Sequence, residues 1–409
     1  MPEPELQQSR VEAVEEARTS RSPASAGPVR VAVAGQELTV FVETWPLIEA
    51  MVRDIHAART RVWLETYIFH DDAAGQVVAA ALHERAAAGV QVRILYDAIG
   101  SKDTSWAFFR ALEQAGAQVH AFHSVREALW KFSLLRILNR RNHRKLLVID
   151  DTAAYFGGMN LVDTTLGLVV SPEALPVSGG WRDVHVRLTG PRQGEVAESF
   201  ERSWRRAHGE PIPRRPRSYR RAKLAAGEES IQFFDSGPGL KHSSAARLFA
   251  RLIRAARRSI TFSMAYFLPV GGVLRELLRA PRRGVLVRVI VPGESDVALV
   301  QHASRHLYTR LLRRRIRIYE RQANMLHSKV MIVDKAWVVV GSCNLDARSL
   351  WINYEFLAVI HSRPLARVLT RIAREEIDNS KRVTFEEFRE RNWWRRLVNG
   401  LAWMLRWWL

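Results

Sequence analysis

From residue 29 onward, short apolar runs alternate with stretches in which apolar residues recur at helical spacing. The short runs are rich in β-branched residues and have strand length. Strands that alternate with helices indicate a largely parallel sheet covered by helices on both faces. The predicted strands are Val29–Val33, Glu37–Val42, Arg61–Phe69 and Val90–Asp97, and the predicted helices are Leu47–Arg59 and Gln76–Ala88.

The same order of elements returns in the second half of the chain. Tyr67-Ile68-Phe69 aligns with Tyr266-Phe267-Leu268, and the surrounding pattern of strands and helices repeats with it. A repeat of this length indicates that a whole domain is duplicated. The matching predicted elements are the helix Ala246–Arg258, the strand Ser259–Phe267, the helix Leu274–Leu278 and the strand Val285–Val291.

Each half also contains one copy of a polar motif, H-x-K-x4-D followed by G-[GS]-x-N. The second copy follows the first by 184 residues, from position 143 to position 327. One copy on its own would be compatible with ordinary core or surface histidines, but two matching copies indicate a duplicated catalytic unit. The candidate catalytic residues are His143, Lys145, Asp150, His327, Lys329 and Asp334, and the motif asparagines are Asn160 and Asn344.

The spacing assigns a role to each type of residue in the motif. His and Lys two positions apart on a strand face the same side, whereas the Asp, seven positions after the His, faces the other side. We therefore interpret the two Asp residues as structural supports. The glycines allow close approach of the backbone, and the lysines and asparagines provide donors for phosphate oxygens. Two imidazoles supply a nucleophile and a proton carrier without a metal.

At these residues the sequence resembles the phospholipase D superfamily, whose signature is the paired H-x-K-x4-D. Three further segments look like the bacterial cardiolipin synthase branch, in its shorter form without N-terminal transmembrane helices: Trp181–His185, Asn344–Leu350 and Asn353–Glu355. The resemblance implies two α/β/α phospholipase D-like domains, each a mixed, mostly parallel sheet flanked by helices. The active site would lie at their pseudo-twofold interface, with no cofactor.

The resemblance also implies roles for individual residues. His143 would form the phosphohistidine, and His327 would act as acid and base; the motif pattern by itself leaves that order open. Asp183 and Glu355 would orient the histidines, since a carboxylate at the far ring nitrogen fixes the tautomer. The alternative for each carboxylate is an ordinary surface residue.

Composition narrows the environment of the chain. Sixty-two basic and 42 acidic residues give a net charge of +20, which suits an anionic membrane or a nucleic acid. The single cysteine, Cys343, excludes an internal disulfide. No apolar run is long enough to span a bilayer, and the N-terminus lacks an apolar signal core. We expect a peripheral protein on the cytosolic face of the bacterial inner membrane.

Two segments combine tryptophan with basic residues, a composition typical of membrane interfaces. The alternative is that both are amphipathic helices packed on the protein body. The residues predicted to contact the membrane are Trp130, Phe132 and Leu135 in the segment 125–141, and Trp393, Trp394, Trp403, Trp407 and Trp408 in the tail. The predicted divisions are a disordered segment 1–28, domains 29–204 and 230–390, a basic connector 205–229 and the tail 391–409.

The sequence thus predicts a cardiolipin synthase-like enzyme that transfers a phosphatidyl group to phosphatidylglycerol and releases glycerol. The donor lipid is left open between phosphatidylglycerol and phosphatidylethanolamine. One alternative is a phospholipase D-type hydrolase acting on phospholipid or nucleic acid. The Trp-rich tail argues against a nucleic acid partner. A second alternative is a non-catalytic lipid-binding protein, which would not need both intact His-Lys pairs.

Overall fold

The computed structural model describes residues 27–123, 139–164, 180–212, 227–239, 243–389 and 393–407. Most of the predicted disordered segment 1–28 lies outside these residues. So does most of the basic segment 125–141, including Trp130, Phe132 and Leu135. Helix α7 (Gln193–Ala207) runs three residues into the predicted connector 205–229, of which residues 213–226 are not described.

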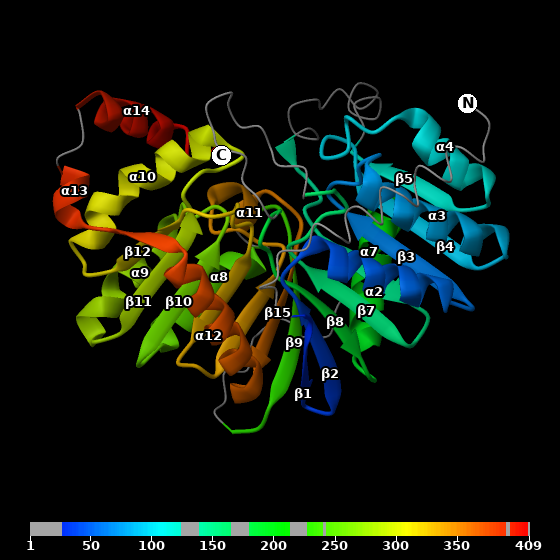
Figure 1. Ribbon diagram of the computed structural model, residues 1–409, viewed down its shortest axis with the longest axis horizontal. Helices are drawn as coiled ribbons and strands as arrows, with labels where there is room; N and C mark the ends of the chain where they lie inside the picture. The colour runs from blue at the N-terminus through cyan, green and yellow to red at the C-terminus, as the bar shows by residue number, and fades with distance from the viewer. Residues whose placement is uncertain are drawn as a thin grey trace.

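The described chain forms two eight-stranded sheets, one from each half (Figure 1). Their strand orders are β1-β2-β8-β7-β6-β3-β4-β5 and β16-β12-β11-β10-β13-β14-β15-β9. The first sheet contains β1 (Val29–Val33), β2 (Gln36–Phe41), β3 (Arg61–Thr66), β4 (Gln91–Asp97), β5 (Gln118–Phe122), β6 (Leu146–Ile149), β7 (Ala153–Gly157) and β8 (His185–Thr189). The second contains β9 (Ser230–Ser236), β10 (Ser259–Met264), β11 (Leu286–Pro292), β12 (Arg317–Arg321), β13 (Lys329–Val333), β14 (Trp337–Gly341), β15 (Glu355–His361) and β16 (Ser380–Val383).

The two sheets are mixed, as predicted, but the expectation that they are mostly parallel is wrong. Only β3-β4-β5 in one sheet and β10-β11-β12 in the other run parallel, and every other neighbouring pair is antiparallel. In those two triplets each strand is joined to its neighbour in the sheet through a helix, and such a crossover allows parallel pairing. Both motif copies instead connect their strands by a short turn, which forces antiparallel pairing.

Helices cover the outer face of each sheet. In the first half these are α2 (Thr44–His56), α3 (Ala73–Ala87) and α4 (Trp106–Gln114). In the second half they are α8 (Ser244–Ala255), α9 (Gly271–Arg279) and α10 (Ala298–Leu312), with the 3₁₀ turn η2 (Ala280–Arg283) after α9. The remaining helices of the second half are α11 (Ala347–Trp351), α12 (Arg363–Asp378), α13 (Phe385–Arg389) and α14 (Trp393–Met404).

The inner faces of the two sheets share one hydrophobic core, to which α7 and α12 also contribute. Phe156 of β7, Phe233 of β9 and Phe356 of β15 form its aromatic centre, with ring centroids 5.6 to 5.7 Å apart. Each half also has a separate outer core against its own helices. The described residues therefore form three hydrophobic cores, and one of them joins the duplicated halves.

Asp150 and Asp334 occupy the turns that join the two strands of each motif. Asp150 accepts backbone hydrogen bonds from Arg59, Thr60 and Arg61 at 2.7–2.9 Å, all at the start of β3. Asp334 accepts three equivalent bonds at the start of β10. Both residues have positive φ, 45° and 52°, a conformation that Asp tolerates better than most residues. Their contacts agree with the interpretation of both aspartates as structural supports.

We expect Asp150→Asn to lower the free energy of unfolding by about 1–2 kcal/mol near pH 7. The asparagine lacks the negative charge and one of the two oxygens that accept these hydrogen bonds. Burial acts to raise the pKa of Asp150, but the bonds from Thr60 and the backbone outweigh it and hold the pKa below its usual value. A lowered pKa stabilises the fold above the unfolded-state pKa of about 3.9, and this contribution is lost as pH falls through the folded-state value.

Denaturant unfolding at pH 7 and pH 3 measures this effect, and the gap between wild type and variant should narrow at the lower pH. The matched control is Asp151→Asn, because the side chain of Asp151 is 83% exposed and contacts Arg61 at the surface. We expect the control to change stability by less than about 0.5 kcal/mol. Equal effects of the two variants would contradict the supporting role of Asp150.

Candidate active site

The two motif copies meet at the boundary between the sheets, where each contacts the backbone of the other half. His143 donates its backbone N–H to Tyr354 O (3.0 Å), and His327 donates to Arg182 O (2.7 Å). His143 and Lys145 lie just before β6, and Lys329 is the first residue of β13. The His and Lys of each copy were expected on one strand, but both histidines precede their strands, and of the two lysines Lys329 lies within its strand.

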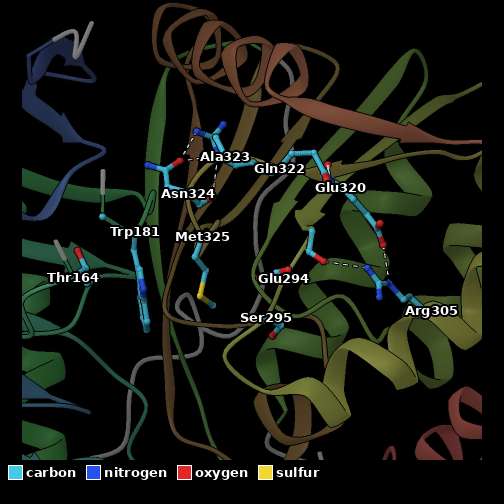
Figure 2. A pocket seen from close by; sticks show the side chains of 13 residues that line it. Thr164, Trp181, Glu294, Ser295, Arg305, Glu320, Gln322, Ala323, Asn324 and Met325 are labelled. Atoms are coloured by element: carbon cyan, nitrogen blue, oxygen red, sulfur yellow. Dashed lines mark hydrogen bonds and ion pairs between the residues drawn. The ribbon is translucent and has the colours of Figure 1, made fainter. Parts of the chain in front are cut away.

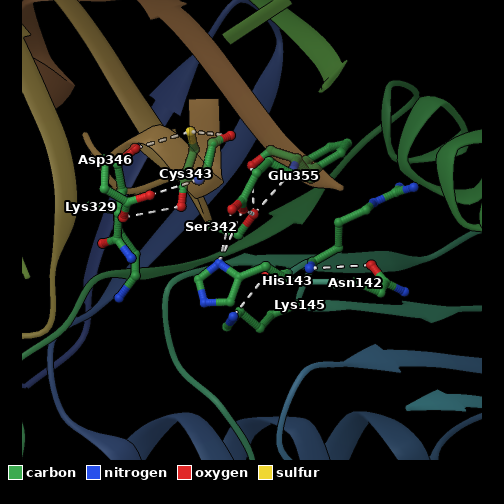
Figure 3. A network of polar contacts seen from close by, with 12 residues as sticks. Asn142, His143, Lys145, Lys329, Ser342, Cys343, Asp346 and Glu355 are labelled. Carbon is green, nitrogen blue, oxygen red and sulfur yellow. Dashed lines mark hydrogen bonds and ion pairs between the residues drawn. The ribbon is translucent and has the colours of Figure 1, made fainter. Parts of the chain in front are cut away.

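Each histidine lies against a carboxylate from the opposite half of the chain. Both oxygens of Glu355, the first residue of β15, lie 3.1 Å from Nδ1 of His143 (Figure 3). Oδ2 of Asp183, in the first half, lies 2.6 Å from Nδ1 of His327. All four side chains are buried, with Glu355 fully so. The two pairs cross the pseudo-twofold interface in opposite directions and leave Nε2 of each imidazole without a carboxylate.

The residues behind the two carboxylates differ between the copies. The hydroxyl of Ser342 donates to Glu355. At the equivalent position the first copy has Gly158, where a Cβ would lie 2.2 Å from Oδ1 of Asp183. Gly158 is thus required for the close approach of the Asp183 carboxylate, whereas Ser342 adds a donor to Glu355. The predicted role of the motif glycines in close approach holds at this position.

The two lysines fold back in the same way. Nζ of Lys145 donates to the carbonyl of His143 (2.8 Å), and Nζ of Lys329 donates to the carbonyl of His327. Lys329 also lies 3.4 Å from Asp183 Oδ2, whereas Lys145 lies over the ring of Tyr67, 5.2 Å from its centroid. One lysine is thus paired with a carboxylate and the other with an aromatic ring.

The motif asparagines are buried at the same interface, with 6% of Asn160 and 2% of Asn344 exposed. Among the described residues, no hydrogen-bond partner reaches Oδ1 of either amide. Buried amides normally have partners, so these two are candidates for contact with a bound substrate.

Burial lowers the pKa of all four motif bases. Burial is the largest cause for His143, whose pKa lies well below its usual value. The charges of Lys145, Lys329 and His327 lower that pKa further. Burial and Lys329 also lower the pKa of His327, against the opposing effect of Asp183. Lys145 falls to a pKa of about 7, through burial and then the charge of Lys329. The mutual influence of these groups shows that both copies belong to one electrostatic site.

The two carboxylates shift in opposite directions. Burial raises the pKa of Glu355 well above its usual range, although Lys145 and Ser342 act against it. Burial also acts to raise the pKa of Asp183, but Lys329 and His327 outweigh it and the net shift is downward. Asp183 is therefore held as an anion beside His327, while Glu355 is held closer to its neutral form beside His143.

Several polar contacts around His143 have no simple sequence signal. Glu65, which is fully buried, accepts from Asn142 Nδ2 at 2.7 Å and lies near Arg144. Asp97 pairs with Arg141 at 3.1 Å. These partners are 44 to 79 residues apart, so a short motif cannot reveal them. The nearest signal in the sequence is that Glu65 lies within the predicted strand Arg61–Phe69.

The aligned tyrosines are not equivalent in the structure. Phe69 bridges to Leu161, and Phe267 bridges to Leu345 in the second half. Phe69 therefore matches Phe267, and the predicted alignment of Tyr67 with Tyr266 is wrong by one residue. Of these two tyrosines, Tyr67 makes a ring contact with a motif histidine, 5.0 Å from His143 between centroids.

The Trp-rich tail forms α14, which packs along α10 (Figure 1). Trp403 is half-buried and stacks on His306 at 5.4 Å, so the packed alternative holds for this residue. Trp394 and Trp407 remain exposed, at 56% and 45%. The side chain of Trp393 and all of Trp408 lie outside the described residues. No helix in the described part of the chain has the length and hydropathy needed to cross a membrane.

Two remaining questions about the site concern its cysteine and the binding of a metal ion. Cys343 is buried as a free thiol in the second G-S-x-N turn. Among the described residues, no group of three His, Cys, Asp or Glu side chains is arranged to hold a metal ion.

Comparison with known proteins agrees with this geometry. A family model described as "Cardiolipin synthase, PLD-like domain" matches residues 51–171 and 249–376. Cardiolipin synthase from Halalkalibacterium halodurans is 32% identical over 380 residues, covering 92% of this chain and 73% of that protein. Cardiolipin synthase A from Buchnera aphidicola is 32% identical over 383 residues, covering 91% and 76%.

A solved structure, phosphatidylserine synthase from Haemophilus influenzae, matches 96% of this chain and 100% of its own with a TM-score of 0.67. At 14% identity this likeness shows the fold alone. With the family match, the two relatives and the duplicated fold together, the chain belongs to the cardiolipin synthase branch of the phospholipase D superfamily and is an enzyme of that superfamily.

Proposed function

We propose that this enzyme makes cardiolipin by transferring a phosphatidyl group from one lipid to the glycerol hydroxyl of phosphatidylglycerol. The observation that carries the proposal is the crossed pairing of His143 with Glu355 and His327 with Asp183 in one buried site. With Nδ1 held by a carboxylate, each imidazole presents Nε2 to a substrate. Lys145, Lys329, Asn160 and Asn344 supply donors for the phosphate oxygens between them.

In the first half-reaction, Nε2 of His143 attacks the phosphorus of phosphatidylglycerol and a P–N bond forms. The bond between phosphorus and the glycerol oxygen breaks, and that oxygen takes a proton from the imidazolium of His327. In the second half-reaction, His327 removes the proton from a hydroxyl of another phosphatidylglycerol. The hydroxyl oxygen attacks phosphorus, the P–N bond breaks, and cardiolipin leaves with His143 restored.

The asymmetry of the two carboxylates supports this assignment of roles. A nucleophile must be unprotonated, and burial with three neighbouring cations lowers the pKa of His143 well below its usual value. A proton carrier needs a partner that stabilises its imidazolium form, and the pKa of Asp183 is lowered beside His327. Glu355, whose pKa is raised, provides less support for an imidazolium at His143. The order that the motif left open is thus argued from the environment of each histidine.

We further propose that α14 rests on an anionic bilayer at the cytosolic face of the bacterial inner membrane. It carries the exposed apolar residues Trp394, Leu397, Val398, Leu401 and Met404, with Leu405 and Trp407 beyond its end. An apolar helix face of this kind, with tryptophan and neighbouring arginines, suits the headgroup layer. Placement on the membrane would bring lipid substrates to the site.

The roles of the histidines predict different intermediates in the two alanine variants. With phosphatidylglycerol labelled in its phosphate, His327→Ala should still form a labelled protein slowly, whereas His143→Ala should form none. Neither variant should make cardiolipin at more than about one-thousandth of the wild-type rate. A rapid quench in alkali, followed by gel analysis at alkaline pH, preserves and detects the phosphohistidine, and loss of the label in acid identifies the P–N bond. Labelling of His143→Ala but not of His327→Ala would reverse the roles, and cardiolipin made by either variant would refute the two-histidine mechanism.

The lysine environment predicts an unusual alkaline limb in the pH profile. Because Lys145 has a pKa of about 7, it loses its positive charge in the free enzyme as pH rises through that value. We expect kcat/KM, which reports the free enzyme, to fall on the alkaline side of about pH 7. Lys145→Arg keeps its charge at all these pH values, so its remaining activity should lack this limb. A limb unchanged in the arginine variant would assign the titration to another group.

The tail predicts a separable defect in membrane binding. Replacing Leu401 and Met404 together by Glu puts charge on the exposed face of α14 and should weaken binding to phosphatidylglycerol vesicles at least tenfold. Cosedimentation measures the binding, and thermal unfolding checks the fold. The matched control is Ala87→Glu at an exposed position on α3. Vesicle binding equal to wild type in the double variant would remove α14 as the contact.

A further inference from the structure

A cavity of about 310 Å³ lies outside the motif residues, and its wall includes Trp181, whose ring contacts that of His327 (Figure 2). Trp181 and Met325 form one side, and Glu294, Ser295 and Arg305 lie across from them. Its volume is at the lower end of the range for small-molecule sites. It is large enough for a polar headgroup and too small for acyl chains as well.

Two contacts join this cavity to the proton-carrying side of the active site. The ring of Trp181 lies 4.8 Å from the ring of His327 between centroids. On the opposite wall, Ser295 precedes Asp296, which accepts a hydrogen bond from Tyr266 at 2.7 Å. The charge of Asp296 reaches His327 and raises its pKa against the lowering effect of burial. The cavity is therefore next to the residue that exchanges protons with an alcohol in the proposed reaction.

The two arginines that line the cavity are each paired with a carboxylate. Arg305 pairs with Glu320 at 2.9 Å, and Arg321 pairs with Glu376 outside the cavity at 2.5 Å. Neither guanidinium is thus left as an unbalanced cation for a phosphate. The carboxylate of Glu294 has no hydrogen-bond or ion-pair partner among the described residues. An open carboxylate beside neutralised arginines repels a second anion and accepts hydrogen bonds from hydroxyl groups.

We propose that this cavity is the subsite for the glycerol headgroup of phosphatidylglycerol, both as the departing alcohol and as the accepting one. The proposal rests on the proposed function and names where its alcohol binds. Glycerol hydroxyls donate and accept, and so match the mixed wall of Glu294, Ser295, Asn324 and paired Arg305. The rings and sulfur of Trp181 and Met325 cover the carbon chain. In both half-reactions the alcohol oxygen that gains or loses a proton must be near His327, and the cavity meets that condition.

The alternative occupant is the ethanolamine headgroup, whose ammonium only donates hydrogen bonds. It would pair with Glu294 but would leave the arginine donors facing a cation. The two headgroups therefore differ in how they depend on Glu294. Loss of the Glu294 carboxylate should weaken the binding of glycerol only in part, because the other polar groups of the cavity wall remain.

The test fills the cavity and measures competition by free glycerol. Ala323 is exposed and lines the cavity, so Ala323→Trp inserts bulk with little effect on the core. The control, Ala87→Trp, makes the same substitution at an exposed alanine outside the cavity. Cardiolipin formation in phosphatidylglycerol vesicles is assayed at increasing concentrations of glycerol or of ethanolamine. Hydrolysis of bis(p-nitrophenyl) phosphate, which has no glycerol, reports the motif residues alone.

We expect Ala323→Trp to raise the apparent KM for phosphatidylglycerol and the inhibition constant of glycerol at least tenfold. Its hydrolysis of bis(p-nitrophenyl) phosphate and its thermal midpoint should match those of the control. Glu294→Ala should raise the inhibition constant of glycerol about threefold to tenfold. Ethanolamine should not inhibit cardiolipin formation. A glycerol constant within twofold of wild type in Ala323→Trp would overturn the subsite. Inhibition of the wild-type enzyme by ethanolamine that is lost in Glu294→Ala would also overturn the glycerol subsite. A wild-type enzyme that makes no cardiolipin in this assay would instead refute the proposed function.

Discussion

The active site depends on the exchange of carboxylates between the two halves of the chain. His143 is held by Glu355 and His327 by Asp183, and the backbone N–H of each histidine bonds to the residue before the opposite carboxylate. Neither half on its own contains both a motif histidine and the carboxylate that contacts it. The shared core around Phe156, Phe233 and Phe356 keeps the halves in register, so that distances of 2.6 to 3.1 Å are maintained across the interface.

Burial is the second constraint, because it sets the protonation of the site. Excluding water lowers the pKa of both histidines and of Lys145, and raises that of Glu355. The same exclusion favours transfer to an alcohol over attack by water. Asp183 departs from this trend because Lys329 and His327 outweigh its burial. This difference, together with the different contacts of the two lysines, distinguishes the two copies of the motif.

Much of this arrangement was available from the sequence, and the missing parts have physical reasons. The motif residues, the duplication and most element positions followed from local spacing, which reflects strand and helix periodicity. The direction of the strands did not, because it depends on whether a crossover or a tight turn joins neighbouring strands, and tight turns join the motif strands in both copies. Asp183 and Glu355 were identified, but their crossing required the packing of two distant segments. The cavity beside Trp181 combines residues from positions 164 to 325, which no local pattern brings together.

The shared core also limits how a lipid reaches the phosphorus-binding groups. Parting the two sheets would expose Phe156, Phe233 and Phe356 to water, at about 25 cal/mol for each Å² of apolar surface. The shared core therefore opposes separation of the two halves. Under the proposed function, a lipid substrate would reach the buried histidines, and its product would leave them, without separation of the two sheets.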